Sequence, residues 1–85
     1  MNIFVAKLSF DTTSESLKAA FERFGEVSSA QVIMDKESGR SRGFAFVEMN
    51  NDEEALAAIS ALDNTEFEGK VIAIQQARGK EAKKN

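Results

Sequence analysis

The sequence predicts an α+β fold of the ferredoxin-like split βαβ type, with a four-stranded antiparallel sheet and two helices on one face. The first observation is the order of the apolar patterns along the chain, which is strand, helix, strand, strand, helix, strand. The second is the length of 85 residues, which suits one small domain with a modest core. The third is that two helices cover only one face of such a sheet, so the other face should meet solvent or a partner.

The first strand and the first helix are predicted from the N-terminal part of the chain. Residues 2–8, NIFVAKL, are apolar and partly β-branched, as in a strand. In the polar stretch that follows, Thr12 and Glu15 fit a capping box, and Thr13 is the alternative cap. The helix should end at Gly25 in a left-handed conformation. Its apolar positions recur at helical spacing: Leu17, Ala20, Phe21 and Phe24.

Residues 42–49, RGFAFVEM, predict the third strand, and its two faces differ in character. Because a strand has period two, the small and aliphatic residues share one face: Gly43, Ala45, Val47 and Met49. The other face carries Arg42, Phe44, Phe46 and Glu48. Burying the phenylalanines would leave the small and aliphatic set in solvent, so we expect the aromatic face to be the open one.

The remaining elements complete the same plan. Residues 27–34 predict the second strand, and a polar loop with Gly39 as its turn residue leads to the third. Asn51 should cap the second helix, residues 63–70 should form a loop, and residues 71–77 should form the fourth strand. The second helix and the fourth strand are expected to contribute these apolar side chains to the core: Ala55, Ala58, Ile59, Leu62, Ile72 and Ile74.

The same alternation adds side chains from the other strands to the open face. They are Phe4, Gln31, Ile33, Ala73 and Gln75, with Lys7 at the end of the first strand. Soluble monomers rarely expose an aromatic cluster without a function. Flat rings on a sheet can stack on unpaired nucleobases while nearby cations meet phosphates. The other phenylalanines lack this pattern: Phe21, Phe24 and Phe67 are expected in the core, and Phe10 in the core or as a loop staple without a function.

Composition and charge limit the chemistry of the chain. The absence of His and Cys excludes the usual zinc sites, a histidine general base and a thiolate nucleophile. The net charge is −3, but residues 78–85 carry +3, so residues 1–77 carry −3 minus 3, or −6. We find no disulfide framework, no apolar run near the ~20 residues that span a membrane, and no leader peptide, so we expect a cytoplasmic protein.

Two segments resemble the signatures of a known family. RGFAFVEM resembles the longer signature of the RNA recognition motif, K/R-G-F/Y-G/A-F-V-x-F/Y, with Met49 where an aromatic residue is usual. IFVAKL, residues 3–8, resembles the shorter signature, with Lys7 where Asn is common. The resemblance covers residues 2 to about 78. It is closer to the compact single-motif proteins of bacteria than to the glycine-rich RNA-binding proteins of plants, whose glycine-rich tail is missing.

The resemblance implies roles for particular residues. Phe4 and Phe44 would each stack on a base, Phe46 would pack against sugar rings, and Arg42 would meet the phosphate backbone. Further RNA contacts are expected from Lys7, Gln31, Ile33, Gln75, Gln76 and Arg78. The domain should span residues 1–78, and residues 79–85 should form a short basic, disordered tail.

These observations predict a protein that binds single-stranded RNA, or single-stranded DNA, without catalysis, cofactor, metal or membrane. A role as an RNA chaperone or post-transcriptional regulator follows by family analogy. One alternative is a protein–protein interaction module, which could use the same sheet or the acidic residues 52–54, although peptide-binding relatives often lose the signature rings. Another is a small hydrolase similar to the acylphosphatases, but the acidic, glycine-free stretch SFDTTSES is a poor phosphate cradle. A homodimer through the sheet face also stays open.

Overall fold

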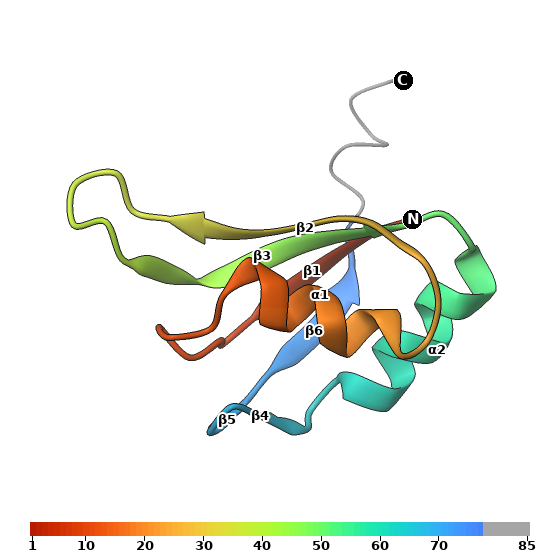
Figure 1. Ribbon diagram of the computed structural model, residues 1–85. Helices are drawn as coiled ribbons and strands as arrows, with labels where there is room; N and C mark the ends of the chain where they lie inside the picture. Colours follow the sequence, from red (N-terminus) through yellow and green to blue (C-terminus); the bar gives the residue numbers. More distant parts are fainter. Residues whose placement is uncertain (78–85) are drawn as a thin grey trace.

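The computed structural model describes residues 1–77, which form two helices, a four-stranded sheet and a small hairpin (Figure 1). The elements are β1 Asn2–Ala6, α1 Ser14–Glu22, β2 Val27–Met34, β3 Ser41–Met49, α2 Asp52–Leu62, β4 Glu66–Phe67, β5 Lys70–Val71 and β6 Ala73–Gln76. No helix within residues 1–77 is both long enough and apolar enough to cross a membrane.

The large sheet has the strand order β2-β3-β1-β6, and all neighbouring strands run antiparallel. The two central strands, β3 and β1, are those that carry the signature segments. Both helices lie on one side of this sheet (Figure 1). The predicted split βαβ plan is therefore confirmed, and neither α1 nor α2 covers the other face of the sheet.

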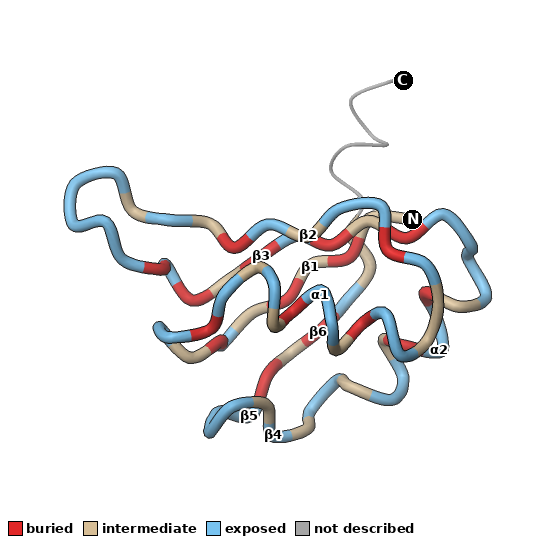
Figure 2. The backbone as a smooth tube through the Cα atoms, in the orientation of Figure 1, coloured by how far each residue is buried: buried red, intermediate tan, exposed pale blue. Residues whose placement is uncertain are grey.

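The core lies between the helices and the covered face of the sheet. Its buried members are Ile3, Val5, Leu8, Leu17, Phe21, Val27, Val32, Ala45, Val47, Met49, Ala55, Ala58, Ile72 and Ile74. Burial alternates along β1 and β3, as the period of two predicts (Figure 2). Met49 is fully buried, so its departure from the aromatic residue of the signature changes core packing and not the open face.

The N-cap of α1 is Thr13 and not Thr12. The Thr13 hydroxyl oxygen accepts a hydrogen bond from the Ser16 backbone N–H at 3.1 Å. Thr12 is buried, and its hydroxyl donates to Glu68 Oε1 at 2.8 Å, which links the turn before α1 to the β4–β5 hairpin. The capping box was therefore wrong, and the alternative cap is confirmed.

Gly25 has a different reason to be glycine from the one predicted. The helix ends at Glu22 with Arg23 as its C-cap, and Gly25 does not have a positive φ. A Cβ atom at this position would lie 2.7 Å from the Cβ of Glu54, at the start of α2. Glycine therefore permits close approach between the segment after α1 and the start of α2, and the prediction of a left-handed cap was wrong.

The segment predicted as a loop at residues 63–70 contains structure of its own. Strands β4 and β5 pair antiparallel as a two-residue hairpin, with Glu68 at φ 52° and Gly69 at φ 90° in the turn. Two successive positive φ angles match the right-handed twist of paired strands. Val71 belongs to this hairpin, so the fourth strand of the large sheet is shorter than predicted and begins at Ala73.

Candidate nucleic-acid interface

Three phenylalanine rings form one cluster on the open face of the sheet. Phe4 of β1 contacts both rings of β3, with centroid distances of 5.8 Å to Phe44 and 5.4 Å to Phe46. The interplanar angles of 41° and 52° are tilted arrangements, which aromatic pairs favour over a face-to-face stack. Phe46 is 43% exposed, and the other two rings are half-buried. The cluster is thus held in place by its own contacts and is still accessible.

Strand register places this cluster at the centre of a row across the whole sheet. Phe46 pairs with Phe4 between β3 and β1. On the outer strands, Gln31 pairs with Phe46, and Gln75 pairs with Phe4. The row therefore runs Gln31, Phe46, Phe4, Gln75, with an exposed amide at each end. Amides offer both a donor and an acceptor, so each end of the aromatic row can form directional hydrogen bonds.

Shallow hollows lie on both sides of the aromatic cluster. One, of about 270 Å³, includes Phe4 and Gln75, and the other, of about 230 Å³, includes Gln31, Phe46 and Glu48. Each hollow is therefore lined by one ring and one amide of this row. A planar group that stacks on a ring would therefore have room beside it for its polar edge.

The cations of the face lie at the end of the sheet where β1 ends and β3 begins. Arg42 is exposed on β3, and Lys7 is exposed just after β1, with a φ of 63°. The two ion pairs found among residues 1–77 involve Lys18 and the Met1 amino group, so neither uses a cation of this face. The charges of Arg42 and Lys7 are therefore available to an anionic ligand.

The structure brings together most, but not all, of the predicted site residues. Ile33 is half-buried on β2, on the same face as Gln31. Gln76 pairs with Ile3, which points into the core, so the alternation puts its side chain on the covered face and away from the rings. Arg78, like the predicted tail, lies outside the described residues.

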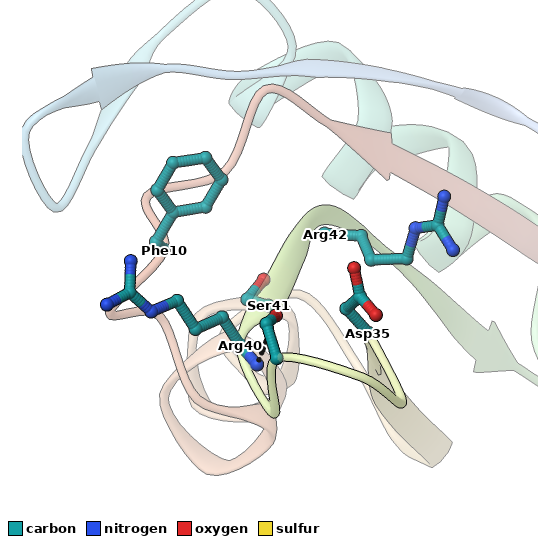
Figure 3. Close-up of a pocket in the computed structure, with 6 residues that line it drawn as sticks. Phe10, Asp35, Arg40, Ser41 and Arg42 are labelled. Carbon is teal, nitrogen blue, oxygen red and sulfur yellow. Dashed lines mark hydrogen bonds between the residues drawn. The ribbon is translucent and has the colours of Figure 1, made fainter.

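One aromatic residue beside the face was missed as a candidate. Phe10 is 70% exposed and lines a hollow of about 580 Å³, together with Arg40 and Arg42 (Figure 3). The prediction of a core or staple role without a function did not anticipate this exposure. The available signal was its position, because Phe10 is a large apolar residue within a polar turn directly after the shorter signature.

Comparison with known proteins agrees with this geometry. The family model of the RNA recognition motif matches residues 3–73. RbpB of Nostoc sp. (strain PCC 7120), a cyanobacterial protein named for RNA binding, is 47% identical over 81 residues, which cover 95% of this chain and 79% of RbpB. The crystal structure of RNA Binding Protein PG1 superposes with a TM-score of 0.88 at 43% identity, covering 91% of this chain and 93% of that one.

A solved complex with RNA also has this fold. The Sxl-lethal protein/RNA complex matches with a TM-score of 0.85 at 28% identity, over 91% of this chain and 46% of that one. The family match extends over both signatures, both helices and all four strands of the large sheet, at least in part. The chain belongs to the RNA recognition motif family.

Proposed function

We propose that the chain binds single-stranded RNA on the open face of its sheet, through Phe4, Phe44 and Phe46. The observation that carries this proposal is the cluster of three accessible rings at the centre of the face that neither α1 nor α2 covers. Stacking of a base on an aromatic side chain is worth roughly 1–3 kcal/mol and tolerates any base. Two or three such contacts are enough for modest affinity.

The surroundings of the rings support RNA as the ligand. Arg42 would meet the phosphate backbone, and Lys7 would add a second positive charge at the same end of the sheet. Gln31 and Gln75 would form hydrogen bonds with base edges, and Ile33 would add apolar contact. Unpaired RNA presents its base edges for such contacts, whereas the deep major groove of an RNA duplex does not. Gln76 would contribute through its backbone at the end of β6.

The names of the relatives point in the same direction. RbpB and PG1 are both named for RNA binding, and the Sxl-lethal protein is named in a complex with RNA. The net charge of −6 on residues 1–77 opposes long, nonspecific contact with polyanions. Binding should therefore be transient and sensitive to salt, which suits an RNA chaperone or a post-transcriptional regulator that acts without catalysis.

An NMR titration tests the proposal directly. Isotope-labelled protein is titrated at low salt with a pool of short single-stranded RNAs, and then with DNA of the same sequences. We expect shifts at Phe4, Phe44, Phe46 and their neighbours. The double variant Phe44→Ala, Phe46→Ala should stay folded and lose these shifts, while the control Val71→Ala, which changes an exposed residue of the β4–β5 hairpin, should keep them.

Two outcomes would contradict the proposal. If the folded wild type shows no shifts with RNA, the exposed rings serve another partner, and a protein-interaction role becomes the leading hypothesis. If shifts occur but map to the helical side of the molecule, the chain binds RNA by a different surface. Stronger shifts with DNA than with RNA would change the ligand and leave the site as proposed.

A further inference from the structure

An acidic side chain lies on the open face of the sheet, next to the cluster of rings. Glu48 is half-buried and shares its side of β3 with Phe44 and Phe46. The strand register places it between Asn2 of β1 and Ser29 of β2. The proposed contacts of RNA with rings, cations and amides do not use this acid. A negative charge on a surface that binds a polyanion costs affinity unless it makes a contact of its own.

Glu48 helps to line the hollow of about 230 Å³ beside Phe46. Among residues 1–77, no lysine or arginine lines this hollow. Arg42 is six positions away along β3, which is about 20 Å in a strand. A phosphate in the hollow would therefore meet a like charge without a compensating cation. The group that suits this place is the polar edge of a base, which carries no formal charge.

The Glu48 carboxylate is available to such a base edge. In the described part of the chain, Glu48 takes part in neither of the ion pairs and in none of the side-chain hydrogen bonds. An ionised carboxylate has two acceptor oxygens and no donor. Both oxygens can therefore accept hydrogen bonds from a ligand, and neither can donate one.

This acid makes the two ends of the aromatic row chemically unequal. The hollow at the β6 end also contains an acid, Asp63, but its Oδ1 accepts a hydrogen bond from the Ile74 N–H at 2.7 Å. The Gln75 amide at that end offers a donor and an acceptor, so it can pair with the edge of any base. Glu48 at the other end suits only an edge that donates. Base identity should therefore be read at the β2 end of the row.

The four bases differ in the donors that they present side by side on their unpaired edges. Guanine has two adjacent donors, N1–H and the N2 amino group, which match the two oxygens of one carboxylate. Cytosine and adenine each have one amino group next to a ring nitrogen that accepts. Uracil has one N–H between two carbonyl oxygens. With these three bases, a carboxylate that reaches the donor also meets a neighbouring acceptor, so guanine is the base that fits Glu48.

We propose that Glu48 selects guanine for the nucleotide whose base edge enters the hollow beside Phe46, by accepting hydrogen bonds from N1–H and the N2 amino group. The inference rests on the proposed function, since it specifies the base that is read at one end of the same RNA site. The Gln31 amide, which lines the same hollow, offers the donor that guanine O6 requires. Glu48 is thus assigned as a residue that determines sequence specificity.

Affinity for RNAs that differ in a single base tests this inference. Fluorescence anisotropy measures Kd for labelled oligouridines whose central nucleotide is uridine, adenosine, cytidine, guanosine or inosine. The protein can shift along the uridines, so a single guanosine can reach the hollow. For the wild type, the RNA with guanosine should bind about 5- to 150-fold more tightly than the others, the value of one bidentate pair. Inosine keeps N1–H but lacks the N2 amino group, so it should lose part of this gain.

Variants of Glu48 separate the contact from the charge. Glu48→Val keeps a residue that favours strands and removes both acceptor oxygens, so the preference for guanosine should fall to within about twofold. Glu48→Gln keeps one acceptor and should retain only part of the preference. Both variants also lose a negative charge, which changes Kd for every RNA alike, so the readout is the ratio of Kd values. The control Glu15→Gln removes the same charge from an exposed position of α1 and should keep the wild-type ratios. Circular dichroism verifies that each variant is folded.

The outcomes separate failure of the inference from failure of the proposed function. If the wild type binds all five RNAs with equal Kd, or prefers a base other than guanine, the inference is overturned and RNA binding stands. If guanosine is preferred and folded Glu48→Val keeps the full preference, another residue reads the base, and the inference is also overturned. If the wild type binds none of these RNAs, nor the pool of short RNAs, the proposed function itself fails, and the inference fails with it.

Discussion

Phe4 is the most informative residue to change, because it contacts both other rings of the cluster. In Phe4→Leu, an apolar side chain remains, but the ring contacts at 5.8 and 5.4 Å are lost. Aromatic pairs contribute about 0.5–1.5 kcal/mol each beyond the area that they bury, so the free energy of unfolding should fall by about 1–3 kcal/mol. In a domain of this size, 1 kcal/mol lowers Tm by about 4–8 °C.

The same substitution should weaken RNA binding by removing one stacking surface. A loss of roughly 1–3 kcal/mol raises Kd by about 5- to 150-fold. The ring carries no charge, so the slope of log K against log salt should not change. This unchanged slope distinguishes a lost stacking contact from a lost phosphate contact.

The assay combines urea unfolding, followed by circular dichroism, with anisotropy of a labelled RNA at several salt concentrations. Binding is measured at a temperature at which Phe4→Leu is fully folded. Phe4→Tyr, which keeps the ring, is the matched control and should bind as the wild type does. A folded Phe4→Leu whose Kd stays within about twofold of the wild type, less than ~0.5 kcal/mol, would refute the role of the central ring.

Two further predictions concern a charge on the open face and the contact between the segment after α1 and the start of α2. Arg42→Gln should weaken binding for all sequences alike and reduce the salt slope by about 0.7, measured by anisotropy; an unchanged slope would show that Arg42 meets no phosphate. Gly25→Ala should lower the free energy of unfolding by about 1–3 kcal/mol, because its Cβ would lie 2.7 Å from Glu54 Cβ. Adding Glu54→Ala should recover part of that loss in urea unfolding, since it removes the outer part of the side chain and leaves its Cβ; no recovery would mean that the strain lies elsewhere.

The face of each strand could be predicted because it depends on local pattern. The alternation of residue types in RGFAFVEM correctly predicted that Phe44 and Phe46 lie on the open face. The same alternation predicted the buried positions of β1 and β3. The predicted cap at Asn51 is also confirmed, since its side chain accepts from the Glu54 N–H at 2.9 Å. Such features involve residues only a few positions apart.

The errors arose where contacts between distant segments decide the outcome. Thr12 has the chemistry of a cap, but its hydroxyl instead bonds to Glu68, which is 56 residues away. Gly25 was predicted from helix-end preferences, whereas its small size is required by Glu54 of the other helix. Periodicity and capping rules do not contain this information.

The sequence alone determined the order of the two helices and the four strands of the large sheet, the face of each signature ring and the membership of the family, because strand period and signature spacing are local properties. Only the tertiary structure decided the row Gln31, Phe46, Phe4, Gln75, since the register between strands is set by packing across the sheet. It also decided that Phe10 and Arg40, 30 positions apart, line one hollow. The Leu8 N–H donates a hydrogen bond to the Gly43 carbonyl and so joins the segment after β1 to β3. This bond brings the turn that carries Phe10 against the β2–β3 hairpin.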